Sequence, residues 1–116
     1  MKILVIEDNA EIMSILEYLL EEEGYEVVSC TDGSSVNNLH NINPDLILLD
    51  ELLPGVKGSS LCKEIKAKET TRHIPIVIIS AVPGLSEIAN DCGADGHIEK
   101  PFNIDNLTTV IKGLIR

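Results

Sequence analysis

Residues 45–58 read DLILLDELLPGVKG, and this stretch decides the fold. Its four consecutive apolar residues, Leu46 to Leu49, run directly into Asp50, and Pro54 then breaks the chain. A short apolar run that ends at turn residues is typical of a strand buried on both faces, as strands are in parallel sheets. Asp50 is therefore expected where a buried strand reaches the surface. Ligands of open α/β proteins bind at that edge, although a lone aspartate there could equally cap the following turn.

Strands and helices alternate along the rest of the chain. Apolar or β-branched runs predict strands at residues 2–6, 25–30, 44–50, 73–79 and 96–99. Apolar residues at helical spacing predict helices at residues 12–23, 34–43, 59–68, 85–92 and 104–115. The alternation predicts one α/β domain over residues 1–116. We expect a doubly wound, five-stranded parallel sheet of flavodoxin-like order 2-1-3-4-5, with helices on both faces.

Composition narrows the classes of partner. The 116 residues suffice for one packed core, and 9 basic against 19 acidic residues give a net charge of −10. Such acidity opposes direct binding to nucleic acid or to an anionic membrane. The 3 cysteines are odd in number and form no CxxC motif, so neither a disulfide framework nor a zinc site is indicated, and a reducing cytoplasm fits best.

Chemically reactive side chains stand at the ends of the predicted strands. Glu7 and Asp8 follow the first strand, Asp50 the third, Ser80 the fourth and Lys100 the fifth. With the order 2-1-3-4-5 the three acids form one pocket, which requires a bound cation or raised pKa values. Mg²⁺ suits such oxygen ligands and leaves room for phosphate oxygens. The set predicts attack by the Asp50 carboxylate on phosphorus, with Mg²⁺ and Lys100 neutralising charge and an aspartyl phosphate as product.

With these residues in view, the whole chain closely resembles the receiver domain of two-component response regulators. The resemblance rests on four stretches that occur in the expected order, together with a closing amphipathic helix: VIEDN at 5–9, DELLPGVKG at 50–58, IISA at 78–81 and GADGHIEKPF at 93–102. Each motif alone is weak, and the ordered set is specific.

The resemblance implies roles for individual residues. Asp50 would be the phospho-acceptor, and Glu7, Asp8 and the Leu52 main-chain carbonyl would bind Mg²⁺ or Mn²⁺ together with it. Lys100 would pair with Asp50 and then with the phosphoryl group.

Two further positions correspond to the family's switch. Ser80 would move toward the phosphoryl group, and His97 stands where relatives often have Tyr or Phe. Without the resemblance, a half-exposed, neutral His97 and a strand-end hydroxyl at Ser80 would be sufficient explanations. The Lys100–Pro101 peptide is cis in most relatives.

The expected function is a phosphorylation-operated signalling switch, possessing no separate substrate but catalysing its own phosphorylation and slow dephosphorylation. A sensor histidine kinase or histidine phosphotransfer protein would donate the phosphoryl group. The receiver would change its surface around the fourth helix, fifth strand and last helix, and act on a downstream protein or on an output domain absent from this chain. The alternatives are a flavodoxin-like cofactor-binding module and a receiver-like interaction domain that no longer takes phosphate.

Three departures from the family bear on behaviour. Glu51 is an acid where relatives usually have an apolar or neutral residue, and strand alternation predicts that it points away from the pocket, as an electrostatic disturbance. Leu52 and Val82 are apolar where relatives can orient the attacking water, so we expect a long-lived phosphoryl group. The segment between Ser80 and Lys100 is about two residues shorter than in most relatives by the family spacing, which alters the output face.

Overall fold

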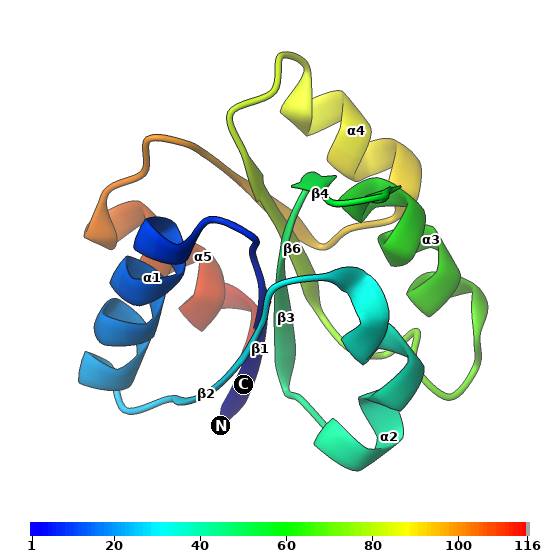
Figure 1. The fold of residues 1–116 in the computed structure, drawn as a ribbon, viewed down its shortest axis with the longest axis horizontal. Helices are drawn as coiled ribbons and strands as arrows, with labels where there is room; N and C mark the ends of the chain where they lie inside the picture. Colours follow the sequence, from blue (N-terminus) through cyan, green and yellow to red (C-terminus); the bar gives the residue numbers. More distant parts are fainter. Residues whose placement is uncertain (116) are drawn as a thin grey trace.

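The computed structural model describes residues 1–115 and forms one five-stranded parallel sheet between two layers of helices (Figure 1). The strands of this sheet are Lys2–Ile6 (β1), Glu26–Cys30 (β2), Leu46–Asp50 (β3), Ile76–Ser80 (β6) and Gly96–Glu99 (β7). The α-helices are Ala10–Glu22 (α1), Leu39–Ile42 (α2), Gly58–Ala67 (α3), Leu85–Cys92 (α4) and Ile104–Leu114 (α5). The order β2-β1-β3-β6-β7 confirms the predicted fold.

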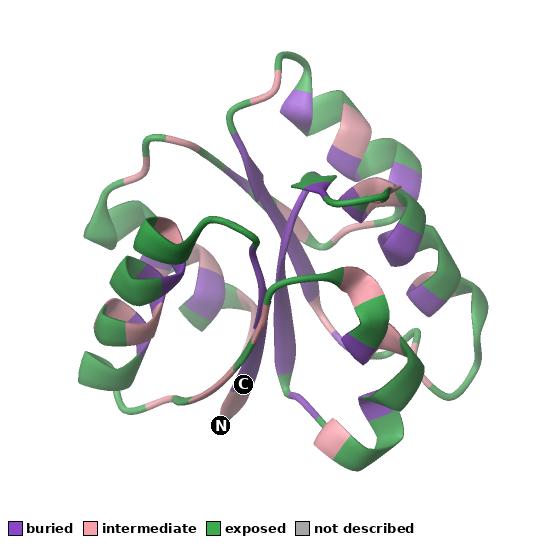
Figure 2. Cartoon of the chain, viewed as in Figure 1, coloured by how far each residue is buried: buried purple, intermediate pink, exposed green. Residues whose placement is uncertain are grey.

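The central strands are buried on both faces, which explains their uninterrupted apolar sequences (Figure 2). Alternate residues of β3 contribute to different cores, because successive side chains point to opposite sides of a sheet. Ile47 and Leu49 pack in the core on the side of α2, α3 and α4, whereas Leu46 and Leu48 pack in the core on the side of α1 and α5. The two cores hold β3 in place from both sides, and with it Asp50 at its end.

The helix predicted over residues 34–43 is mostly a 3-10 helix, Gly33–Asn38 (η1), followed by the four-residue α2. The Asp32 side chain accepts a hydrogen bond from Ser34 N at 2.9 Å and starts this segment. Three asparagines lower its helix propensity, and Asn43 ends it in the left-handed conformation with φ 51°. The strand predicted from residue 73 begins only at Ile76, because the preceding Pro75 has no N–H for the ladder.

A small hairpin follows β3 that the sequence analysis did not predict. Leu52–Leu53 (β4) pairs antiparallel with Val56–Lys57 (β5) across a Pro-Gly turn. Gly58 N donates to Glu51 O at 2.9 Å and continues this ladder, so Leu52 and Lys57 form a non-hydrogen-bonded pair. The main-chain N–H and C=O of Leu52 therefore point away from β5.

Side-chain caps begin helices α1 and α5, and glycines follow the ends of α1 and α4. The Asn9 side chain accepts from Ile12 N at 3.0 Å at the start of α1, and the Asn103 side chain accepts from Asn106 N at 2.7 Å at the start of α5. Gly24 and Gly93 follow α1 and α4 with φ of 90° and 80°.

Among residues 1–115, the helices lack the length and apolar content needed to span a membrane.

Gly58 packs so closely against β3 that a side chain is excluded. A Cβ at this position would overlap the main-chain carbonyl oxygen of Asp50. We expect Gly58→Ala to lower the free energy of unfolding by about 2 kcal/mol, the usual cost of overpacking. Urea denaturation measures this change. Gly113→Ala is the matched control, because a Cβ there meets nothing within 4 Å. Equal stability of the two variants would contradict the close packing.

Candidate functional site

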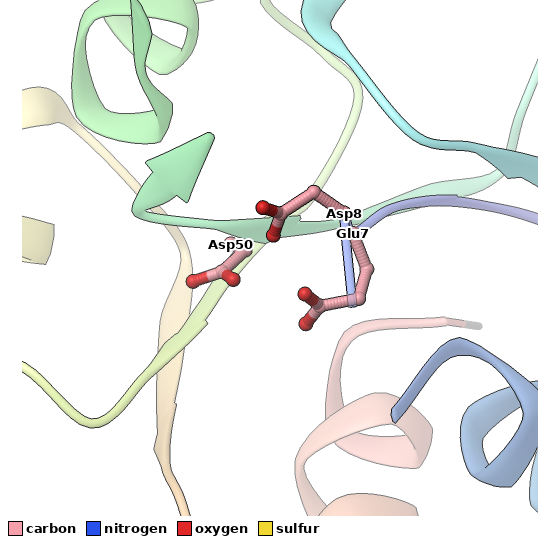
Figure 3. Close-up of side chains that lie close together, drawn as sticks. All are labelled: Glu7, Asp8 and Asp50. Atoms are coloured by element: carbon pink, nitrogen blue, oxygen red, sulfur yellow. The ribbon is translucent and has the colours of Figure 1, made fainter. Parts of the chain in front are cut away.

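Three carboxylates meet where β1 and β3 lie side by side (Figure 3). Glu7 and Asp8 directly follow β1, and Asp50 is the last residue of β3. One carboxylate oxygen from each lies within 4.8 Å of the other two. Glu7 and Asp50 are only 1% and 4% exposed, whereas Asp8 lies open to solvent. The structure thus brings together the three acids that were predicted to form one pocket at neighbouring strand ends.

Lys100, which follows β7, places its ammonium group between the two buried acids. Its Nζ lies 2.8 Å from Glu7 Oε1 and 3.2 Å from Asp50 Oδ2. Burial raises the pKa of Glu7, an effect that the Lys100 hydrogen bond opposes and the charge of Asp50 reinforces. Burial lowers the pKa of Lys100, but its hydrogen bonds and charge interactions with Glu7 and Asp50 outweigh this and raise it. One cation facing three carboxylates leaves the pocket with excess negative charge.

Main-chain N–H groups orient the two buried carboxylates. Asn9 N donates to Glu7 Oε2 at 3.1 Å, and Leu52 N donates to Asp50 Oδ1 at 3.2 Å. The N–H and C=O of one residue in an extended strand point to the same side. Since the N–H of Leu52 points at Asp50, its carbonyl also points toward the acidic pocket. This carbonyl is therefore a candidate fourth oxygen donor beside the three carboxylates.

The remaining predicted residues lie on the next strands. Ser80 ends β6, is 1% exposed, and accepts a main-chain hydrogen bond from Lys100 N at 2.9 Å through its carbonyl. The peptide bond between Lys100 and Pro101 is cis, as the resemblance implied. His97 lies on β7, outside the acidic cluster, and is exposed to solvent where the sequence suggested a half-exposed ring. Ser80 is therefore linked to Lys100 through the main chain, while His97 lies apart from the acidic cluster.

Glu51 differs from the expectation of a disturbing surface charge. It does point away from the acidic cluster, but it is only 5% exposed and is fully engaged. Its Oε1 accepts from Ser59 N at 2.6 Å and its Oε2 accepts from Ser59 Oγ at 2.9 Å. The positive end of α3 accounts for this placement of a carboxylate. The sequence feature that pointed to this contact is Lys57, which stands at the N-cap of α3 and makes no cap hydrogen bond, so the helix needs a cap from elsewhere.

Sequence reasoning also missed an apolar groove beside Lys100. It has a volume of about 470 Å³ and lies between α1 and the segment that leads into α5. Its apolar walls come from Ile12, Ile15, Leu19, Ala81, Pro101, Phe102 and Ile104. Ile15 and Ile104 are 51% and 45% exposed, although both lie within the apolar patterns of their helices. The groove forms only when the start of α5 is brought beside α1.

The raised pKa of Glu7 predicts a pH-dependent gain in stability on Glu7→Gln. The folded pKa lies above the ordinary value of 4.5, so ionisation of Glu7 costs stability as the pH rises through that window. The amide removes this cost and still offers an oxygen to Lys100. With a chelator present, we expect the unfolding free energy of Glu7→Gln to exceed that of the wild type at neutral pH, with the difference shrinking below pH 4.5. Urea denaturation at several pH values measures it.

Glu69→Gln, at an exposed position, makes the same change of charge and serves as the control. A difference between Glu7→Gln and the wild type that stays constant across these pH values would contradict a raised pKa of Glu7.

Comparisons with known proteins agree with this geometry. The family model of the response regulator receiver domain matches residues 3–112. The phosphate regulon transcriptional regulatory protein PhoB of Escherichia coli is 40% identical over 99% of this chain, which spans 52% of PhoB. This chain thus covers about half the length of the curated relative.

Two solved structures are similar to the whole chain. The magnesium-bound receiver domain of the Pseudomonas aeruginosa sensor histidine kinase PA1611 is 32% identical, with a TM-score of 0.89, over 98% of this chain and 96% of that one. The BeF3-activated receiver domain of Klebsiella pneumoniae RstA is 25% identical, with a TM-score of 0.89, over 100% and 99% of the two chains. The chain belongs to the response regulator receiver family, whose members are phosphorylation-dependent signalling switches.

Proposed function

We propose that Asp50 accepts the phosphoryl group in this receiver. The observation that carries the proposal is a buried aspartate at a strand end, with Lys100 Nζ 3.2 Å from one of its oxygens and two further acids beside it. A carboxylate oxygen of Asp50 forms a bond to phosphorus while the bond between phosphorus and the donor's imidazole nitrogen breaks. The imidazole leaves with the bonding electron pair and takes up a proton. The product is an acyl phosphate on Asp50.

The acidic pocket fits a divalent cation. Glu7, Asp8, Asp50 and the Leu52 carbonyl offer oxygen donors, which Mg²⁺ prefers, and Mn²⁺ accepts the same set. Such a cation neutralises negative charge on the phosphoryl oxygens. The PA1611 receiver domain, with its magnesium ion in the active-site cleft, supports this assignment. Lys100, 3.2 Å from Asp50 Oδ2, would supply a second positive charge.

Phosphorylation would alter two switch positions, Ser80 and His97. A phosphoryl group on Asp50 adds negative charge and acceptor oxygens beside the buried Ser80. New contacts to these oxygens would favour one of two conformations of the receiver. His97 is exposed on β7 and lies among the residues that line a groove with α5, so its movement would change the surface formed by α4, β7 and α5.

The apolar groove beside Lys100 offers a surface for the protein that donates the phosphoryl group. A sensor histidine kinase or a histidine phosphotransfer protein must bring a phosphohistidine to Asp50, and the groove adjoins Lys100 at the same edge of the sheet. The downstream target is then a protein or an output domain outside this chain. The three free cysteines are consistent with the cytoplasm, where such donors act.

Incubation with Mg²⁺ and a small phosphodonor such as acetyl phosphate tests the acceptor assignment. We expect intact mass spectrometry to show one added phosphoryl group on the wild type, which is lost when a chelator replaces Mg²⁺. Asp50→Asn should show no added mass, because the amide cannot form the acyl phosphate. Asp45→Asn, an aspartate at the opposite end of β3, is the matched control and should still gain the group. An unchanged gain on Asp50→Asn would overturn the proposal.

The side chain of Leu52 predicts a slow loss of this group. The side chain of Leu52 is 59% exposed and offers no polar atom to orient a water. The side chain of Val82, which is partly buried, offers none either. We expect Leu52→Asn to shorten the half-life of the acyl phosphate roughly tenfold, a modest share of what a positioned polar group can contribute. The decay of phosphorylated protein, followed by mass spectrometry, measures it. Leu52→Met should leave the half-life unchanged, and equal decay of the three proteins would refute the explanation.

A further inference from the structure

Helix α3 begins without a cap of its own. Lys57 occupies the N-cap position, and its side chain accepts no hydrogen bond from the helix. The N–H of Ser59, in the first turn, is instead satisfied by Glu51, which lies before the hairpin. Helix N-termini attract carboxylates because their free N–H groups carry partial positive charge. Glu51 therefore supplies from the end of β3 what Lys57 cannot supply locally.

Glu51 makes three connections between the strand end and the helix. Its two carboxylate oxygens accept from Ser59 N and Ser59 Oγ at 2.6 Å and 2.9 Å, and its main-chain carbonyl accepts from Gly58 N at 2.9 Å. The carboxylate is 5% exposed, so these hydrogen bonds are shielded from water. These hydrogen bonds close the base of hairpin 52–57 through both the side chain and the main chain of Glu51. The closure anchors a loop that contains only two-residue strands.

The anchored loop carries part of the acidic pocket. Glu51 stands between Asp50 and Leu52 in the chain, and Leu52 points its N–H at Asp50 Oδ1, 3.2 Å away. The carbonyl of Leu52 points to the same side. A rotation at Glu51 would move both groups, since the backbone of consecutive residues is continuous. The side chain that fixes Glu51 thus also restrains the orientation of Leu52 toward the pocket.

We propose that Glu51 is a positioning residue of the cation site, tethering the end of β3 to α3 so that the Leu52 carbonyl stays directed at the carboxylates. The inference rests on the proposed function, because it assumes that this carbonyl is a cation ligand. Two simpler roles make different predictions. As a helix cap alone, Glu51 would affect stability without affecting cation affinity; as a charge alone, it would act through its negative sign and not through its hydrogen bonds.

Binding of Mg²⁺ to the unphosphorylated protein, measured by isothermal titration calorimetry, separates these roles when it is combined with urea denaturation. Glu51→Leu removes both the charge and the hydrogen bonds. Glu51→Gln removes the charge but can keep two hydrogen bonds to Ser59. Adding Lys57→Ser to Glu51→Leu gives a double variant in which α3 has a local cap but the tether is not restored. Glu51→Leu with Lys57→Ala has the same net charge as that double variant and no cap.

We expect Glu51→Leu to weaken Mg²⁺ binding about tenfold, the lower end of what residues supporting a metal ligand contribute. Glu51→Gln should bind Mg²⁺ close to the wild-type affinity. The double variant Glu51→Leu with Lys57→Ser should regain stability against urea but keep the weakened Mg²⁺ affinity. The double variant Glu51→Leu with Lys57→Ala should regain neither the stability nor the affinity. The Lys57→Ser variant also serves if Glu51→Leu alone does not fold.

Three results would overturn the inference. Recovery of Mg²⁺ affinity together with stability in the Lys57→Ser double variant would make Glu51 a helix cap only. Equal weakening in Glu51→Gln and Glu51→Leu would make it a charge only. Wild-type affinity in Glu51→Leu would remove any role at the pocket. A wild-type protein that binds no Mg²⁺ would instead refute the proposed cation site itself, and the inference with it.

Discussion

The repulsion among three carboxylates at the junction of β1 and β3 is the constraint on which the site depends. Two of these acids, Glu7 and Asp50, are buried, and Lys100 is the cation placed between them. Burial, with a smaller contribution from the charge of Asp50, raises the pKa of Glu7, so the ionised form of this group opposes folding. The surrounding core must therefore hold the strand ends against that repulsion. Lys100 alone leaves the site with excess negative charge, which a bound cation would relieve.

The sheet supplies the necessary rigidity. β1, β3 and β6 are buried on both faces, and two separate apolar cores clamp them between the helices. Burial of many aliphatic side chains outweighs the unfavourable electrostatics at one edge, because each contributes on the order of 1.5–3 kcal/mol. The rigid strands end at the acidic pocket, while the loop beyond β3 carries Glu51 and Leu52. The buried middle of each strand thus provides stability, and the end of the strand carries the residues of the site.

The loop after β3 illustrates how one unusual residue is accommodated. An acid at position 51 would destabilise a pocket that already holds excess negative charge. Its side chain is instead directed at the N-terminus of α3, where the helix lacks a local cap. The same loop presents an exposed Leu52 to solvent beside Asp50, while its main chain faces the carboxylates. In this short segment the side chain of Glu51 therefore caps α3, while the main chain of Leu52 faces the carboxylates.

The sequence by itself determined the alternation of strands and helices and the set of strand-end residues, whereas the order of the strands was an expectation that the structure confirmed. These follow from local patterns: apolar runs such as Leu46 to Leu49, helical spacing, and the rule that parallel strands end at one edge. Only the tertiary structure decided the partner of Glu51, the orientation of Leu52 and the groove between α1 and the start of α5. Each of these depends on segments that are separated in the chain, such as Ser59, which donates to Glu51, or Ile15 and Ile104, which line one groove. Periodicity reports which face of an element is apolar, and it does not report which other element covers that face.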